Sequence, residues 1–271
     1  MSGRSGEHHG GHLRLVSWNI AAGRFPRPGP HLERIAEVLA AADADLVALQ
    51  EVDRVQERTG GVDQAARLAD ALGMRAWFTP AIVYDTPAGG GGRGLAHGAA
   101  DPGGAAYGIA LLSRVALSVP ERLVLPQAGL LPASRRRLEP RVAMVTTVAA
   151  GDRLARPLTL AVAHLANAFP WSLVQLRHLQ GRLRGPGRDG PLVLVGDLNL
   201  RPLLVRALAR PGWRAVLHGL TFPGDAPTRQ LDHVLLAGAG VPRVAGICIP
   251  DAPVSDHRPV QVDLDLTLPP S

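Results

Sequence analysis

The chain has 271 residues, enough for one large domain, and with 46% hydrophobic and 19% charged residues it is neither disordered nor fibrous. Its single cysteine, Cys248, excludes an intramolecular disulfide and a zinc site built from cysteines. The net charge is +6, and all 29 basic residues are arginine. Arginine binds phosphate in a bidentate manner, so the surplus indicates a phosphate-bearing partner, although coding bias in a GC-rich genome is the simpler explanation.

We expect one domain over residues 13–267, between a flexible N-terminal tail (1–12) and a short C-terminal tail (268–271). No apolar run approaches the roughly 18 residues needed to span a bilayer, and the N-terminal residues lack the apolar segment of a secretory signal. The sequence therefore predicts a cytoplasmic protein without a membrane span, and a monomer is the expected oligomeric state.

Short apolar runs separated by turns predict β-strands at residues 13–18, 45–50, 107–112, 141–148, 158–163, 191–195, 231–236 and 259–266. Helical spacing of apolar residues predicts helices at residues 30–42, 62–72, 171–184 and 202–209. Several of the strands are apolar at nearly every position, which is typical of a sheet covered on both faces. Two stacked sheets with helices outside are therefore expected. Residues 85–104, rich in Gly, Ala and Pro, are predicted to form a long flexible loop that covers a substrate as a lid.

Polar side chains stand where these predicted strands begin or end. In chain order they are Asn19, Glu51, His164, Asp197, Asn199, Asp232, His233, Asp256 and His257. Strand ends lie at a common rim of a sheet, so residues from separate strands can converge there. Any one of them alone is most simply a solvated loop residue. The whole set predicts a single cluster of carboxylates, amides and imidazoles.

The strings VSWNI, LVALQEVD, YGIALLSR, VAHLAN, VGDLNLRP, TFPGDAPTRQLDHVLL and VSDHRPV occur in this order. Together they resemble the endonuclease/exonuclease/phosphatase superfamily, which includes DNase I-like nucleases, abasic-site endonucleases, neutral sphingomyelinases and inositol polyphosphate 5-phosphatases. The resemblance covers residues 13 to 266. It implies an α+β fold, a four-layered α/β/β/α sandwich of two mixed sheets flanked by helices, and a divalent-metal-dependent phosphoesterase.

The resemblance also implies a metal site. Glu51, Asn19 and Asp256 offer oxygen ligands suited to Mg²⁺ or Mn²⁺, which act on the scissile phosphate as Lewis acids. Asp197 accepts a proton from the attacking water or holds that water in line, and Asn199 orients the nucleophile or the phosphate. A carboxylate and an amide two residues apart on an extended segment point to the same side, so both reach one site.

The remaining implied roles concern the phosphate itself. His257 hydrogen bonds to the phosphate, and Asp232 holds its other ring nitrogen and favours the protonated form. His164 contacts a second non-bridging oxygen, and Tyr107 donates its phenol to the phosphate. Arg141 is expected to be a supporting cation that binds the substrate.

Other positions are expected to be structural. His233 stands where family members often carry tyrosine, and Ala163 where they more often have a hydroxyl residue. Asp53 is predicted to be a surface carboxylate, and Arg135–Arg137 a solvated loop.

The family does not determine the substrate, because its discriminating elements are loops. The first hypothesis is an endonuclease-like enzyme that hydrolyses a nucleic-acid phosphodiester by in-line attack of water. The alternative is a small-molecule, inositol or lipid phosphoesterase, and a non-catalytic binder of phosphate ligands comes last. Aromatic residues are 4% of the chain and no run interleaves them with arginine, which argues against recognition of single strands by stacking.

Overall fold

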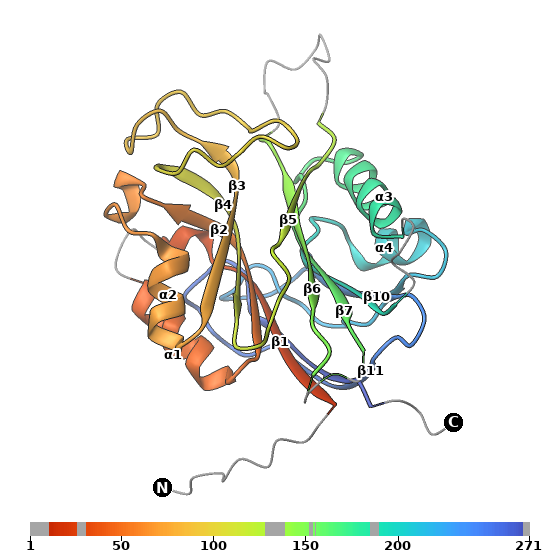
Figure 1. Ribbon diagram of the computed structural model, residues 1–271. Helices are drawn as coiled ribbons and strands as arrows, with labels where there is room; N and C mark the ends of the chain where they lie inside the picture. Colours follow the sequence, from red (N-terminus) through yellow and green to blue (C-terminus); the bar gives the residue numbers. More distant parts are fainter. Residues whose placement is uncertain are drawn as a thin grey trace, which may run out of the picture.

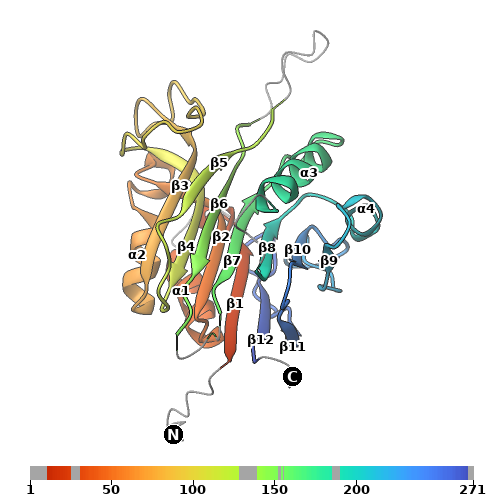
Figure 2. The same cartoon turned by 45° about the vertical axis from the view of Figure 1, so that its right-hand side comes forward.

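The computed structural model describes residues 11–25, 31–127, 139–151, 154, 156–184 and 190–267. Two six-stranded sheets stack face to face, and helices cover their outer faces (Figure 1). Figure 2, turned by 45°, shows α2 (Gln64–Leu72) on one side of the strands and α3 (Trp171–Leu183) and α4 (Pro202–Leu208) on the other. The predicted α+β sandwich of two mixed sheets is therefore confirmed. No helix within the described ranges is long and apolar enough to cross a membrane.

The first sheet consists of β1 (His12–Asn19), β2 (Leu46–Arg54), β3 (Arg75–Val83), β4 (Ala106–Ser113), β11 (Arg243–Cys248) and β12 (Val260–Asp265). Their spatial order is β11-β12-β1-β2-β4-β3. β1 and β2 run parallel, and the other neighbours pair antiparallel. The crossover between the parallel strands contains α1 (Leu32–Ala42), which covers the outer face together with α2 (Gln64–Leu72) (Figure 1).

The second sheet consists of β5 (Glu121–Val124), β6 (Val142–Val148), β7 (Leu158–His164), β8 (Leu192–Asp197), β9 (Arg214–Ala215) and β10 (Asp232–Ala237). Their spatial order is β5-β6-β7-β8-β10-β9. Here β7 and β8 are parallel, joined through α3 (Trp171–Leu183), while their outer neighbours pair antiparallel. α3 and α4 (Pro202–Leu208) cover the outer face of this sheet. Each sheet therefore has one β-α-β crossover near its centre.

The strands are apolar on both faces because each face packs against a different layer. In β1, Leu13 and Leu15 belong to the core between the sheets, whereas Val16 and Trp18 pack toward α1 and α2. β7 and β8 alternate in the same way between the inter-sheet core and the layer of α3 and α4. Because side chains alternate between the two faces of a strand, one strand contributes both to the core between the sheets and to the core beneath the helices.

Four strands were not predicted from the sequence: β3, β5, β9 and β11. Each lies at a sheet edge or is very short, so its apolar pattern is weak. β11 is exposed or half-buried along its whole length, and β3 contains Pro80, which reduces the strand signal. Chain positions 1–10, 30, 135–137 and 268–271, which were assigned to the tails, a helix start and a loop, lie outside the described residues.

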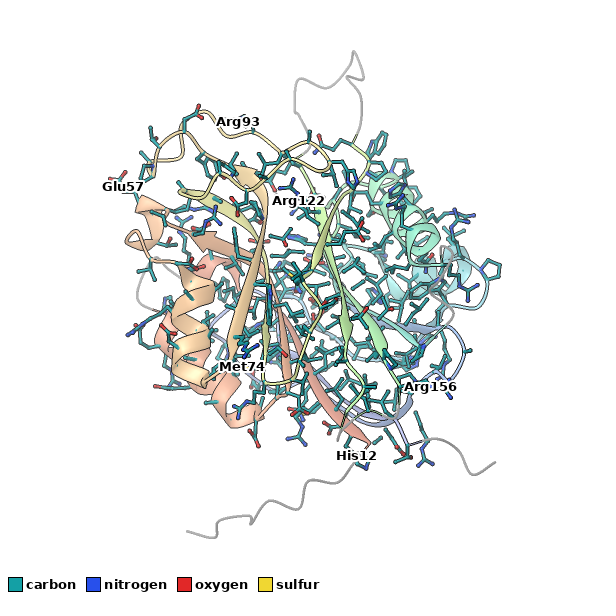
Figure 3. All side chains as sticks on the ribbon, in the orientation of Figure 1. His12, Glu57, Met74, Arg93, Arg122 and Arg156 are labelled. Atoms are coloured by element: carbon teal, nitrogen blue, oxygen red, sulfur yellow. The ribbon has the colours of Figure 1, made fainter. Side chains whose placement is uncertain are left out.

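The segment 85–104 contains no helix or strand, as predicted, but it is attached to both sheets. Arg54 at the end of β2 binds both oxygens of Asp101, at 2.6 and 2.8 Å, and the carbonyl of Gly104 at 2.8 Å. Arg122 of β5 donates to the carbonyls of Ala96 and Ala99. Arg93 on the loop and Arg122 can be located in Figure 3. The loop therefore spans the ends of the two sheets.

The inter-sheet core should dominate stability. Leu111 of β4 is 0% exposed there, so we expect Leu111→Ala to lower the free energy of unfolding by about 2–5 kcal/mol through lost burial and the cavity left behind. Leu203 of α4 is 77% exposed, and Leu203→Ala should change the free energy of unfolding by less than about 0.5 kcal/mol. Urea denaturation measures both. Equal effects of the two variants would contradict this packing.

Candidate functional site

The polar residues predicted at strand ends converge at one edge of the sandwich. Asn19 ends β1, His164 ends β7 and Asp197 ends β8, so three of the four parallel strands bring a polar side chain to this edge. Asp232 begins β10 directly opposite Asp197 in the antiparallel register. His257 lies just before β12, which starts beside the end of β1. Carboxyl ends of parallel strands and amino ends of their antiparallel partners meet here.

Glu51 is presented by a bulge rather than by the end of a strand. β2 continues to Arg54, and its register against β4 shifts between Leu49 and Val52. Glu51 has a φ of 55°, a left-handed conformation that a non-glycine residue adopts only where its surroundings enforce it. The expectation that Glu51 follows the strand is therefore corrected. The extra residue places its side chain in the cavity, 31% exposed.

The same bulge changes the face on which Asp53 lies. Val47 and Leu49 pack toward the helices, and after the extra residue it is Val52 that does so. Asp53 then points inward opposite Tyr107, is 0% exposed, and binds Arg58 through two hydrogen bonds of 2.7 and 2.6 Å. The prediction of a surface carboxylate at Asp53 is wrong, because strict alternation from Leu49 would have placed this residue on the other face.

Asn19 links the carboxylates of the two sheets. Its Nδ2 donates to Glu51 Oε1 at 3.0 Å and to Asp197 Oδ2 at 3.2 Å. Its Oδ1 accepts a hydrogen bond from the backbone of Ala21 at 3.1 Å and retains a second lone pair. The side chain is buried, so its position is determined by these contacts.

Asp197 lies at the centre of the cluster. Its Oδ2 is 3.5 Å from His164 Nε2 and 3.6 Å from His257 Nε2. Burial raises the pKa of Asp197, and the charge of Asp232 raises it further, while the charge of His257 lowers it. The preceding residue has to be glycine, because Gly196 has a φ of 138° and a Cβ there would lie 1.9 Å from the carbonyl oxygen of Ala163.

His257 and Asp232 form a buried pair. His257 Nδ1 donates to Asp232 Oδ2 at 2.8 Å, and both residues are less than 5% exposed. Burial alone would lower the pKa of His257, but the charge and hydrogen bond of Asp232, with the charges of Asp197 and Asp256, outweigh it and raise the pKa to about 10. The imidazole is therefore protonated at neutral pH and directs a charged Nε2–H toward the cavity.

His164 is held in the opposite charge state. Arg141 Nη1 lies 2.9 Å from its Nδ1 and 3.3 Å from its Nε2, so the guanidinium donates to an unprotonated nitrogen of this ring. Burial, followed by the charges of Arg141 and His257, holds the pKa of His164 well below its usual range. The ring is therefore neutral, and its Nε2 faces Asp197 Oδ2 at 3.5 Å.

Asn199 reaches the site by a different route from the expected one. Its φ is 50°, so residues 197–199 are not extended. Instead, the backbone N–H of Asn199 donates to Asp197 Oδ1 at 2.9 Å, and its side-chain amide donates to the carbonyl of Leu165 at 3.0 Å. Asn199 still lines the cavity, but the argument from strand alternation was wrong.

Two sets of residues offer metal ligands. Asp197, Asp232 and His257 have ligand atoms within 4.8 Å of one another. However, a protonated His257 cannot bind a cation, and its charge already offsets part of the charge of these carboxylates. Glu51 and Asp256 are different, because burial raises the pKa of Glu51 and the negative charge of Asp256 raises it further. A cation beside these two carboxylates would relieve that repulsion.

These side chains surround a cavity of about 520 Å³. Of the predicted residues, those that line it are Glu51, Arg141, His164, Asp197, Asn199, Asp256 and His257. Asn19, Tyr107 and Asp232 do not line it. Tyr107 is buried under Arg58, whose guanidinium lies 5.6 Å from the ring centroid. Residues 85–104 are all described and none lines this cavity, which gives the lid hypothesis no support.

Sequence reasoning missed part of the cavity wall, which consists of Asn167, Phe169, Leu200, Arg201, Leu204, Phe222, Arg229 and Leu231. Several of these belong to the strings VGDLNLRP and TFPGDAPTRQLDHVLL, in which the sequence predicts a role in the site only for Asp197, Asn199 and Asp232. His233 is buried and its Nε2 donates to the carbonyl of Leu200 at 2.8 Å, in agreement with the structural role expected for it.

Comparisons with known proteins agree with this architecture. A model described as the Endonuclease/Exonuclease/phosphatase family matches residues 16–257. An endonuclease/exonuclease/phosphatase from Beutenbergia cavernae DSM 12333 is 25% identical, with a TM-score of 0.67 over 94% of this chain and 72% of that chain.

Two further solved structures share the fold. Humanized D. rerio TDP2 is 16% identical, with a TM-score of 0.64 over 94% of this chain and 99% of that chain. The catalytic domain of human nocturnin, with a bound sulfate anion, is 19% identical, with a TM-score of 0.65 over 94% of each chain. Comparison with curated proteins found no match.

The pair of Asp53 and Arg58 lies behind the Glu51 bulge and should be needed for stability. Arg58→Ala leaves a fully buried carboxylate unpaired, and we expect the free energy of unfolding to fall by about 2–3 kcal/mol, because Arg58 itself is partly exposed. The double variant Asp53→Leu with Arg58→Met should recover part of the loss, and the exposed Arg67→Ala should have almost no effect. Urea denaturation distinguishes these outcomes. If Arg58→Ala and Arg67→Ala are alike, the pair does not stabilise this strand.

Proposed function

The chain belongs to the endonuclease/exonuclease/phosphatase family, and from that premise we propose that it hydrolyses a phosphodiester by in-line attack of water with the aid of a divalent metal ion. The observation that carries the proposal is the division of charge in the cavity. A protonated His257 stands on one side of Asp197, and the unbalanced carboxylates Glu51 and Asp256 stand in the same cavity. An anionic substrate would fit between the protonated His257 and a metal ion bound by Glu51 and Asp256.

Glu51, Asp256 and the free lone pair of Asn19 Oδ1 are the groups that would hold the metal. Their donor atoms are oxygens, which Mg²⁺ and Mn²⁺ prefer. When bound there, the ion supplies a Lewis acid for the scissile phosphate. The hydrogen bond from Asn19 to Glu51 keeps the carboxylate turned toward the cavity.

Different residues of this chain then bind the phosphate and activate the attacking water. His257 donates its Nε2–H to a non-bridging oxygen and stabilises the charge that develops there, and Asp232 keeps it protonated and oriented. Asp197, with its raised pKa, accepts the proton of the attacking water, because a base near neutrality is the most effective one. The neutral His164 contacts a second non-bridging oxygen, and Asn199 lines the same cavity.

Arg141 and Tyr107 hold the residues of the site in place, Arg141 at the cavity wall and Tyr107 beneath it. Arg141 is 6% exposed, pairs with Glu139 at 3.1 Å and fixes the ring of His164. It contributes positive charge at the cavity wall, where it meets the substrate. Tyr107 is buried, and its hydrogen bond with Arg141 makes it a support for the guanidinium rather than a direct donor to phosphate.

Nucleic acid is the first substrate that we propose, and a small-molecule, inositol or lipid phosphoester the second. Supercoiled plasmid, abasic duplex, single-stranded oligonucleotide, bis(p-nitrophenyl) phosphate and sphingomyelin, each with Mg²⁺ and with Mn²⁺, separate these classes. Activity on nucleic acid should fall steeply as salt rises, because counterion release contributes to binding. Turnover of none of these phosphoesters with either metal would contradict the proposal.

Loss of the base or of the imidazolium should greatly reduce turnover without unfolding the chain. We expect Asp197→Asn and His257→Ala each to lower kcat roughly 10²–10⁴-fold on bis(p-nitrophenyl) phosphate. The matched controls are the exposed Asp70→Asn and His178→Ala, which should retain activity. Circular dichroism checks the fold of each variant. Near-normal turnover by either active-site variant would eliminate the mechanism.

Glu51→Gln tests the metal separately. The amide is a weaker ligand than the carboxylate, so the Mn²⁺ concentration for half-maximal activity should rise roughly tenfold or more. Isothermal titration calorimetry of Mn²⁺ binding should show the same loss without any substrate. Glu33→Gln, at an exposed position of α1, is the control. An unchanged Mn²⁺ affinity in Glu51→Gln would show that the metal binds elsewhere, as at the group around Asp197.

A further inference from the structure

The cavity has a second region beyond the residues assigned to the phosphate. Its wall there is partly aromatic and aliphatic, from Phe169, Phe222 and Leu204, and it carries two guanidinium groups, those of Arg201 and Arg229. Phe169 is 63% exposed although it is a large apolar side chain. Hydrolysis of a phosphate requires none of these five residues.

Arg229 is held beside the proposed imidazolium. The ring of Phe222 lies 4.9 Å from the ring of His257, centroid to centroid, and the guanidinium carbon of Arg229 lies 4.7 Å from the centroid of Phe222. Phe222 thus contacts both cations. A second positive charge therefore lies on the same aromatic ring as the group proposed to bind the scissile phosphate.

The segment that carries Arg229 is a hydrogen-bonded turn. Phe222 and Arg229 pair through two backbone hydrogen bonds of 2.9 and 2.8 Å, and the N–H of Thr221 also donates to the Arg229 carbonyl at 2.8 Å. Little backbone freedom remains to be lost when a ligand binds here. Arg201 is the N-cap residue of α4. It lies two residues after Asn199, which lines the cavity, so its backbone is also close to the site.

Neither arginine has an acidic partner among the described residues. Some of the other described arginines meet carboxylates, as Arg258 meets Asp251 at 2.9 Å and Arg243 meets Asp265 at 2.7 Å. Arg141, the third arginine of the cavity, is paired with Glu139. Arg201 and Arg229 are therefore the cavity cations whose charge the described part of the chain leaves unbalanced.

We infer that Arg201 and Arg229 bind a second phosphate group of the substrate, adjacent to the scissile phosphodiester. Phe169 and Leu204 contact the apolar part of the substrate that lies between or beside these two phosphates. The inference rests on the proposed function and narrows its substrate class. The substrate is a phosphodiester that carries a neighbouring phosphate on the same sugar, as in a short nucleic-acid strand or a nucleoside bisphosphate ester. A diester with a single phosphate cannot make the contacts with Arg201 and Arg229 and should bind more weakly.

Two chromogenic substrates that differ only in this group test the inference. One is the p-nitrophenyl ester of thymidine 5′-phosphate, and the other is the same ester with an added 3′-phosphate. With Mn²⁺, the wild-type chain should show a kcat/KM roughly tenfold or more higher for the second, because a charged hydrogen bond contributes this much. The ratio should fall to about one in the double variant Arg201→Gln with Arg229→Gln and stay unchanged in the control Arg67→Gln. It should also shrink as salt is raised.

A ratio near one in the wild type, or a ratio that persists in the double variant, would overturn the inference while leaving the phosphoesterase intact. Binding provides a readout that needs no turnover. Calorimetry should show thymidine 3′,5′-bisphosphate binding about tenfold more tightly than thymidine 5′-phosphate, with the difference lost in the double variant. If neither ester is hydrolysed but this difference in binding is present, the proposed hydrolysis fails and the second phosphate site stands. Equal binding of the two nucleotides overturns the site.

Discussion

The structure depends on the placement of one β-α-β crossover in each sheet. A parallel pair needs a helix to return the chain, so β1-α1-β2 and β7-α3-β8 leave the carboxyl ends of each pair at one edge. Antiparallel neighbours must then begin where these strands end, which brings Asp232 and the segment before β12 to the same edge. Because the two sheets stack with these edges together, residues from distant parts of the chain meet around Asp197.

The concentration of acidic groups at this edge has to be balanced electrically. Burying carboxylates without compensation is costly, and here Asp197 and Asp232 share the charge of a protonated His257. Glu51 and Asp256 lie beyond that pairing, and Asn19 offers Glu51 only a neutral amide. Burial raises the pKa of Glu51, and the charge of Asp256 raises it further, although the Asn19 hydrogen bond and the charges of Arg141 and His257 lower it. The same electrostatics that keep His257 charged thus leave a place for an external cation.

Much of the site was predictable because it follows from strand ends, which a polar residue directly before or after an apolar run marks in the sequence. His164, Asp197, Asp232 and His257 were found in this way. Backbone irregularities carry no such signal: the bulge at Glu51 reverses the alternation of β2 and moves Asp53 inward, and Asn199 turns in a left-handed conformation. Phe222 and Arg229 were missed because a turn, not an apolar period, places them against His257.

The lysine-free composition has physical consequences whatever its origin. Among the residues that the structure describes, three arginines lie over aromatic rings: Arg54 over Phe78, Arg58 over Tyr107 and Arg229 over Phe222. A planar guanidinium can stack through its face while its edge donates hydrogen bonds, and Arg54 and Arg58 do this with Asp101 and Asp53. An ammonium group, which lacks a flat face, cannot combine the two contacts in this way. At Arg229, where the face rests on Phe222, the edge of the guanidinium keeps its donors for a ligand in the cavity.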